Sequence, residues 1–180
     1  RKASLRRGGL VYQINIPSQM SREDFLRIFG GVYEHSQWIA EQLYDSGLTS
    51  RQDTPEALQM AMATKVELAG KEPQLALLRA HPDLAGKLAV SGNLTEESTS
   101  EQASADLGNC TPEEFEAFQS LNDHYKEKFG FPFILAVRGY HRTEILEIFK
   151  QRADNDVEAE FNEALTQVHK IALLRLNEIK

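Results

Sequence analysis

The sequence is almost without cysteine, and this absence limits the ways in which the chain can be held together. Cys110 is the only cysteine among 180 residues, which excludes an intramolecular disulfide and any zinc site built on several thiolates. Cys110 precedes Thr111-Pro112, where a helix is expected to begin. Two interpretations follow: a thiol activated by the helix end, or a structural thiol without chemistry.

Positive charge is also scarce. The chain has 20 Lys and Arg against 27 Asp and Glu, a net charge of −7, which argues against binding along a nucleic-acid backbone. The one basic cluster, "RKASLRRGG", stands at the N-terminus of a sequence that does not begin with Met. We expect residues 1–10 to be a disordered tail or an addition to the natural chain, with a nucleic-acid-binding arm as the alternative.

Long apolar runs and common cofactor motifs are missing as well. No run is long enough to cross a bilayer, no secretory signal is recognisable, and the ending "NEIK" is not a peroxisomal signal, so we expect a cytoplasmic protein without membrane contact. The sequence contains no HExxH, Gly-rich phosphate loop or GxSxG motif. These absences accord with a protein that holds no metal ion.

Helical patterns dominate what is present, and they predict one all-α domain over residues 11–180. Ser21 is expected to cap a helix with Phe25 and Phe29 on its inner face, and a second helix after Gly30-Gly31 is expected to carry Val32, Trp38, Ile39 and Leu43. Further helices are expected over residues 54–69 and 72–80, with a stop at His81-Pro82, and over 111–129, 142–152 and 156–180.

Two features refine this pattern. Thr111 and Glu114 form a capping box at the start of the helix that Gly130 ends. "FPFILAVRG" is the one strand-like run, and because a lone strand has no partner, it is interpreted as a buried extended or partly helical connector.

The segment after Leu94 is compatible with a helix but carries almost no large apolar residue. Ser98, Glu101, Gln102 and Ala105 would share one face. One interpretation is a solvated surface helix. The other is a helix that is docked for a polar purpose, since nothing apolar on its opposite face would anchor it.

Two further residues stand out. Arg175 lies beside the predicted apolar stripe of the last helix, and it either pairs with a structural carboxylate or reaches a cavity. His81 lies at a helix junction from which its side chain can project into a cleft. That stripe is expected to consist of Phe161, Leu165, Val168, Ala172, Leu176 and Ile179.

Four blocks, "HPDLAGK", "LTEESTSEQASADL", "FGFPFILAVRG" and "HKIALLRL", together resemble the OHCU decarboxylases in order and spacing, from about Phe25 to the C-terminus. That family acts on 2-oxo-4-hydroxy-4-carboxy-5-ureidoimidazoline, between urate and allantoin. The resemblance implies an all-α, multi-helix decarboxylase that forms a homodimer, needs no cofactor and binds a small ureidoimidazoline. One departure is Asp106, where the family pattern suggests a small residue.

The resemblance also implies roles for individual residues. His81 would be the catalytic acid/base, with Glu101 and Arg175 as its catalytic partners. The substrate-binding residues would be Pro82, Ser98, Gln102, Phe133, Ile134, Leu135, Ala136 and Val137. Two other functions stay open: a non-catalytic helical adaptor, and a different small-molecule lyase or hydrolase on the same scaffold.

Overall fold

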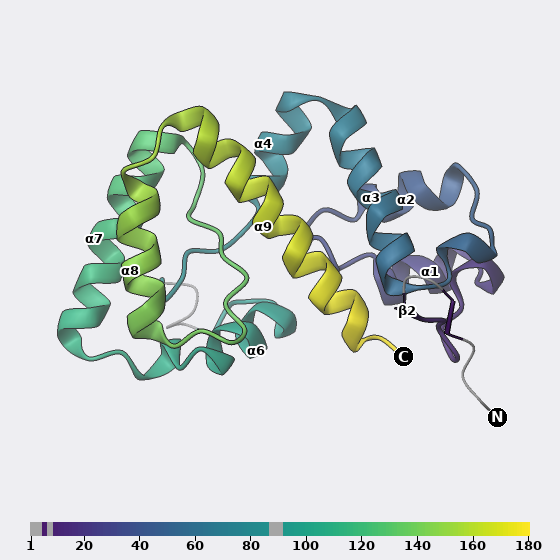
Figure 1. Ribbon diagram of the computed structural model, residues 1–180, viewed down its shortest axis with the longest axis horizontal. Coiled ribbons are helices and arrows are strands. Elements are labelled where there is room, and N and C mark those ends of the chain that lie inside the picture. The colour runs from purple at the N-terminus through teal and green to yellow at the C-terminus, as the bar shows by residue number, and fades with distance from the viewer. Residues whose placement is uncertain (1–4, 7–8, 87–91) are drawn as a thin grey trace. The chain divides into compact units, whose positions relative to one another are not determined.

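The computed structural model describes residues 5–6, 9–86 and 92–180, and nearly all of its regular structure is helical (Figure 1). The helices are α1 (Arg22–Phe29), α2 (Trp38–Asp45), α3 (Pro55–Ala69), α4 (Lys71–Arg79), α6 (Glu96–Ser104), α7 (Pro112–Phe129), α8 (Arg142–Ala153) and α9 (Val157–Glu178), with single 3₁₀ turns η1 (Pro17–Gln19), η2 (Ser50–Gln52) and η3 (Leu107–Asn109). The all-α prediction is confirmed.

The β-structure of the described residues is limited to one short antiparallel ladder near the N-terminus. Strand β1 (Leu5–Arg6) pairs with β2 (Gly9–Leu10), so that Leu5 faces Leu10. Much of the predicted tail, residues 1–4 and 7–8, lies outside the described residues, so its interpretation stays a prediction.

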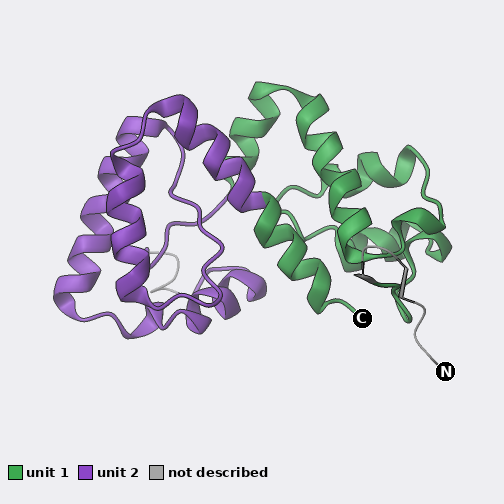
Figure 2. Ribbon diagram, in the orientation of Figure 1, with its two compact units in different colours: residues 1–80, 169–180 green, residues 81–168 purple. Residues whose placement is uncertain are grey.

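The chain divides into two compact units (Figure 2). Unit 1 contains residues 1–80 and 169–180, and unit 2 contains residues 81–168. Helix α9 therefore contributes its first part to unit 2 and its last part to unit 1. Whether residues 11–180 behave as the single domain expected from the sequence stays a prediction.

Unit 1 is built around aromatic residues from α1 and its neighbours. Ser21 caps α1 by accepting a hydrogen bond from the backbone of Asp24 (3.2 Å), as predicted. Phe25 and Phe29 are fully buried one helical turn apart. Their rings lie 5.1 Å apart, so α1 is fixed by the face that its sequence period indicated.

The helix predicted after Gly30-Gly31 begins later than expected. Val32 is buried but lies before α2, which starts at Trp38. The intervening residues form turns, and His35 has a positive φ of 47°, which interrupts any helix. The prediction that Val32 belongs to the second helix was therefore wrong.

Unit 2 contains a buried ionic centre inside an aromatic core. Glu160 is fully buried, accepts a hydrogen bond from the Tyr125 hydroxyl and pairs with Arg152 at 3.0 Å. Arg152 also donates to the backbone oxygen of Ile134 (2.6 Å) and lies 4.5 Å from the ring of Phe133. One ion pair thereby links α7, α8, α9 and the segment after Gly130.

That segment confirms the predicted buried connector. Residues 131–137 form no helix and no strand, and all except Ala136 are buried. Side chains take the place of a sheet partner: Ile134 accepts from Arg152, and Ala136 donates its N–H to Gln167 Oε1 (3.0 Å). The backbone can therefore stay extended in the core.

The buried face of α9 matches the prediction in part, since Val168, Ala172 and Leu176 are buried as expected. Phe161, Leu165 and Ile179 are only half-buried. The buried residues are Glu160, Ala164, Gln167, Val168, Ile171, Ala172, Arg175 and Leu176. A prediction from apolar residues alone could not identify this face, because Glu160, Gln167 and Arg175 are polar and yet buried.

We expect Arg152→Met to lower the free energy of unfolding by roughly 3–5 kcal/mol, because the substitution leaves the buried Glu160 carboxylate without its cation. Urea denaturation followed by circular dichroism measures the change. The control is Arg22→Ala, which removes an exposed pair with Asp45 and should leave the midpoint nearly unchanged. Equal midpoints for Arg152→Met and the wild type would contradict the role given to this pair.

The stability of the chain should also depend on pH through His169, whose ring nitrogen Nδ1 forms a 2.8 Å hydrogen bond with the Tyr33 hydroxyl. Burial lowers the pKa of His169, so the folded chain holds the neutral imidazole while the unfolded chain takes up a proton more readily. This contribution is present above about pH 6.5 and is lost as the pH falls. Denaturation between pH 7.5 and 5.5 should show a weaker loss in His169→Gln; an identical pH dependence would refute it.

Candidate active site

His81 stands directly after α4, where the sequence predicted the helix to stop. The helix ends at Arg79, Ala80 caps it, and the residue before Pro82 is excluded from the helical region. His81 is 8% exposed, so its imidazole is nearly covered rather than solvated.

The turn that follows His81-Pro82 has an unusual backbone. Ala85 has a φ of +50°, a left-handed conformation that a residue with a Cβ rarely adopts. A Cβ at Gly86 would lie 2.7 Å from the Cβ of Asp83, so only glycine closes the turn without displacement. Lys87, which ends the "HPDLAGK" block, lies outside the described residues.

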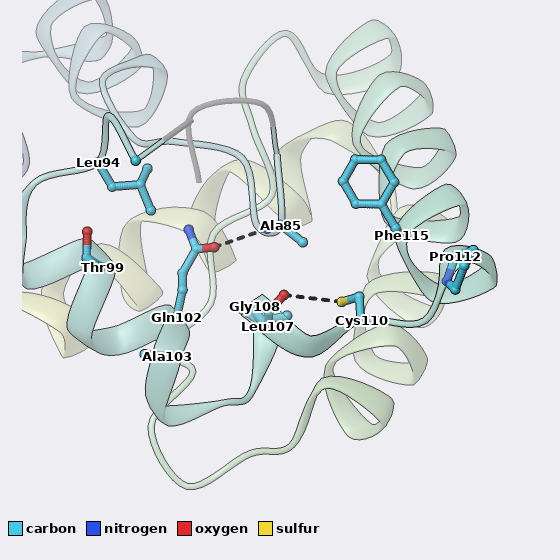
Figure 3. Close-up of a pocket in the computed structure, with 11 residues that line it drawn as sticks. Ala85, Leu94, Thr99, Gln102, Ala103, Leu107, Gly108, Cys110, Pro112 and Phe115 are labelled. Carbon is cyan, nitrogen blue, oxygen red and sulfur yellow. Dashed lines mark hydrogen bonds between the residues drawn. The ribbon is translucent and has the colours of Figure 1, made fainter. Parts of the chain in front are cut away.

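Helix α6 holds this turn with one amide side chain. Gln102 accepts a hydrogen bond from the Ala85 N–H at Oε1 (3.1 Å; Figure 3). It also donates from Nε2 to the backbone oxygen of Asp83 (3.3 Å). The Gln102 side chain therefore shapes the segment next to His81, a contact that the sequence did not indicate. Its predicted contact with substrate stays a prediction.

The polar face of α6 faces the protein. Thr95 caps the helix, Ser98 and Gln102 are buried, and Glu101 is partly exposed. Ala105, one turn on, is 1% exposed. Of the two interpretations open from the sequence, the docked helix is confirmed and the solvated one was wrong.

Asp106, the departure from the family pattern, follows α6 with a φ of +59°. Glycine is the residue that a left-handed position favours, and Asp is one of the few others that tolerate it. Its carboxylate pairs with Arg142 and accepts a hydrogen bond from Asn109, which lowers the pKa of Asp106. The side chain is thus used to tie η3 to the start of α8.

Helix α7 supplies three contacts to the same turn that the sequence analysis missed. Gln119 donates to the Ala85 oxygen (2.8 Å), Asn122 to the Leu84 oxygen (3.0 Å), and Lys126 to the Asp83 carboxylate (2.8 Å). The one available signal was Asn122, a polar residue among Phe118, Leu121 and Tyr125 on the inner face of a helix.

A cavity of about 640 Å³ lies beside α6 and the start of α7 (Figure 3). Its lining is mainly apolar and includes Leu94, Leu107 and Phe115, with Gln102 as a polar member. The predicted catalytic residues His81 and Glu101 are not among its lining residues, and neither is Ser98, which was predicted to bind substrate.

Cys110 borders this cavity. Its thiol donates to the Leu107 oxygen (3.3 Å), and burial raises its pKa, which disfavours the reactive thiolate. The structural interpretation of the lone cysteine is therefore the better one.

The predicted backbone contacts of residues 133–137 are partly occupied. The Ile134 oxygen and the Ala136 N–H are bonded to Arg152 and Gln167, and the Val137 oxygen accepts from Tyr140. In the part of the chain that the structure describes, no backbone–backbone hydrogen bond involves Phe133 or Leu135. Whether a backbone group of this segment meets a ligand stays a prediction.

Arg175 belongs to unit 1, where it forms a buried ion pair. Its Nη1 lies 2.8 Å from Glu34 Oε2, and the two side chains are 4% and 1% exposed. The same nitrogen lies 3.5 Å from the backbone oxygen of Gly31. Glu34 was not anticipated, because a single acid between two helices carries no sequence pattern.

The residues of the predicted site are divided between the two units. His81, Pro82, Ser98, Glu101, Gln102 and residues 133–137 belong to unit 2, and Arg175 belongs to unit 1. The convergence of Arg175 with His81 and Glu101 stays a prediction.

The described residues form neither a metal-binding cluster nor a helix that could span a membrane. Over residues 9–86 and 92–180, no group of His, Cys, Asp and Glu side chains is arranged to hold a metal ion. Within the described residues, every helix is too short or too polar to span a membrane.

Comparisons with known proteins identify the family of this chain. The sequence model of the OHCU decarboxylase family matches residues 18–177. The 2-oxo-4-hydroxy-4-carboxy-5-ureidoimidazoline decarboxylase of Haloferax volcanii is 42% identical over 93% of this chain and 94% of its own length. The protein of that name from Halalkalicoccus jeotgali is 43% identical over 90% of this chain and 88% of its own length.

Solved structures share the fold. A crystal structure of (S)-allantoin synthase superimposes with a TM-score of 0.71 at 34% identity; it covers 89% of this chain, which spans 51% of that one. An OHCU decarboxylase crystallised in the presence of (S)-allantoin gives a TM-score of 0.65 at 23% identity, over 88% and 97% of the two chains, which supports the fold alone. The family match and the close relatives over most of its length show that this chain belongs to the OHCU decarboxylase family and is a decarboxylase.

Proposed function

We propose that this chain converts 2-oxo-4-hydroxy-4-carboxy-5-ureidoimidazoline to (S)-allantoin and CO₂ in urate degradation, without a metal or organic cofactor and with His81 as the acid/base. The observation that carries this proposal is the match over nearly the whole chain to relatives named for that decarboxylation. The solved relative named (S)-allantoin synthase supports the product and its handedness.

The substrate can act as its own electron sink. One ring carbon carries both the carboxylate and a hydroxyl and lies next to a C=N bond. When the bond to CO₂ breaks, its electron pair moves into the ring and the ring nitrogen takes up negative charge. The ring nitrogen then takes up a proton, and protonation of the neighbouring carbon on one face, with loss of the hydroxyl proton, gives the carbonyl of allantoin. Chemistry of this kind needs no external electron sink.

His81 is proposed to handle the proton. An imidazole titrates near neutral pH and can both accept and donate a proton. Its low exposure and the firm turn beside it support the role, since a proton must reach one face of a flat intermediate if a single enantiomer is to form.

Helix α6 is proposed to form the polar wall of the site. Glu101 would orient His81 or bind the substrate hydroxyl or ureido N–H groups. Ser98 and Gln102, together with Pro82 and the backbone of residues 133–137, would fix the planar ring. Burial of Ser98 and Gln102 on one face of a helix with no apolar anchor supports this arrangement.

Arg175 is proposed to meet a carbonyl oxygen on which negative charge grows. Binding of the departing carboxylate would instead stabilise the ground state and slow the reaction. The ion pair with Glu34 supports this role, because it holds the guanidinium in one orientation and compensates its charge before substrate binds.

The proposal also includes a homodimer, which the family resemblance implies, and keeps the cytoplasmic location expected in the sequence analysis. Analytical ultracentrifugation measures the first directly, and a monomer at micromolar concentration would exclude it.

Replacement of His81 by Asn or Gln should lower turnover by about 10²- to 10⁴-fold, because neither amide can exchange a proton near neutral pH. Circular dichroism of freshly oxidised urate, after hydrolysis of its first product, follows the formation of (S)-allantoin. His124→Gln, on the exposed side of α7, should behave as the wild type. Undiminished stereoselective formation in the His81 variants would refute the acid/base role.

Arg175→Met should lower turnover by about 10²- to 10³-fold and also destabilise the chain by roughly 3–5 kcal/mol, since Glu34 is left as a lone buried charge. The double variant Arg175→Met/Glu34→Leu separates these effects, because the buried charge is removed with its partner. We expect the double variant to recover stability in urea but not turnover. Recovery of both would show that Arg175 is purely structural.

A further inference from the structure

The turn after His81 is held in a conformation that it would not keep by itself. Ala85 occupies the left-handed region, which costs about 1–2 kcal/mol for a residue with a Cβ, and the turn closes tightly at Gly86. Strain of this kind persists only where neighbouring groups impose it. The groups that impose it are therefore part of what sets the position of His81.

The neighbouring groups come from two helices. Gln102 of α6 binds both ends of the turn, and α7 contributes Gln119, Asn122 and Lys126. The α7 residues are three and four positions apart, so they line one side of that helix. Among them Lys126 is exposed and Gln119 half-buried, while Asn122 is 1% exposed.

Asn122 makes a single, well-defined contact. Its Nδ2 donates to the Leu84 oxygen at 3.0 Å, and this fixes the orientation of the amide, since only the nitrogen can donate to a carbonyl. Among the described residues, Oδ1 has no hydrogen-bond partner. A buried amide that makes one bond contributes little to stability, so its contact with Leu84 is the property to explain.

The contact lies three residues from His81, and the chain between them is stiff. Pro82 has a fixed φ and also restricts the backbone of His81, so few torsions can absorb a shift at Leu84. The Asp83 oxygen is tied to Gln102. A displacement of Leu84 would therefore reach the imidazole.

We propose that Asn122 is a positioning residue for the decarboxylation: by holding the Leu84 carbonyl it fixes the turn that aims the His81 imidazole at the substrate. The proposal rests on the function proposed above for His81. Asn122 itself touches no reacting group and acts through the backbone of residues 82–84.

The test replaces Asn122 with Leu, which has nearly the same shape but cannot donate a hydrogen bond. We expect kcat to fall about 10- to 100-fold while KM stays within about twofold, because a misdirected imidazole slows proton transfer without weakening substrate binding. The histidine signals in NMR spectra, assigned with His81→Gln, should show a shifted His81 imidazole in substrate-free Asn122→Leu.

Phe118→Leu is the matched structural control. Phe118 is fully buried on the same helix, its ring centroid lies 6.4 Å from that of Phe149, and its side chain cannot form a hydrogen bond with the turn. This variant should lose at least as much stability as Asn122→Leu in urea and yet keep the wild-type kcat and His81 signals. Equal losses of kcat in the two variants would show a merely structural role and overturn the proposal.

Two other results would also overturn it: an unchanged kcat in folded Asn122→Leu, or unchanged His81 signals. If Asn122→Leu does not fold, Asn122→Ser serves instead, because its hydroxyl is too short to reach Leu84 and the same changes are expected. The NMR readout needs no substrate. If the wild-type protein makes no allantoin, the proposed function is wrong. A shifted His81 signal in Asn122→Leu would still support the positioning role of Asn122.

Discussion

The buried pair between Arg152 and Glu160 is the constraint on which unit 2 depends. Its members lie on α8 and α9, the Tyr125 hydroxyl brings in α7, and a second arm of Arg152 reaches the Ile134 oxygen. A buried ion pair adds little net stability, because the cost of removing both charges from water offsets their attraction. Loss of either member, however, leaves an uncompensated charge in an apolar core. The pair therefore fixes which packing of these elements is allowed. The extended segment 131–137 lies where it does because this centre holds its backbone, and the aromatic rings pack around it.

Around that scaffold, amide side chains hold the two irregular segments to which the proposed function assigns the chemistry. Gln102, Asn122 and Gln119 bind the turn next to His81, and Gln167 binds the segment after Gly130. Both segments lack regular secondary structure, so their backbone groups need partners from elsewhere. A short amide side chain supplies a donor and an acceptor without adding charge to the site. Amide side chains thus hold both irregular segments in place. The non-catalytic adaptor considered from the sequence is excluded by the relatives, which are named as decarboxylases.

Much of the fold could be predicted because local signals carry it. The caps at Ser21, Thr54 and Thr111 and the end at Gly130 all occur where the sequence indicated, since each follows from chemistry within four residues. The face of α9 could not be read from apolar residues, because Glu160, Gln167 and Arg175 are buried by partners distant in sequence. The pairing of Arg175 with Glu34 and the amide contacts to residues 83–85 could not be predicted either, because they also join residues that are distant in sequence. The catalytic assignments came from family resemblance, and only the burial of the α6 polar face had an independent physical basis.

The extended segment has a consequence for how the chain behaves among its own copies. Phe133 to Val137 is an unbroken run of uncharged, apolar residues, the composition from which intermolecular β-structure grows. Such growth starts from a strand whose N–H and C=O groups are open to a second chain. Here Arg152 and Gln167 occupy two of those groups, and the run is largely buried. The side chains that hold the segment in place therefore also keep its backbone from pairing with a second chain for as long as unit 2 stays folded.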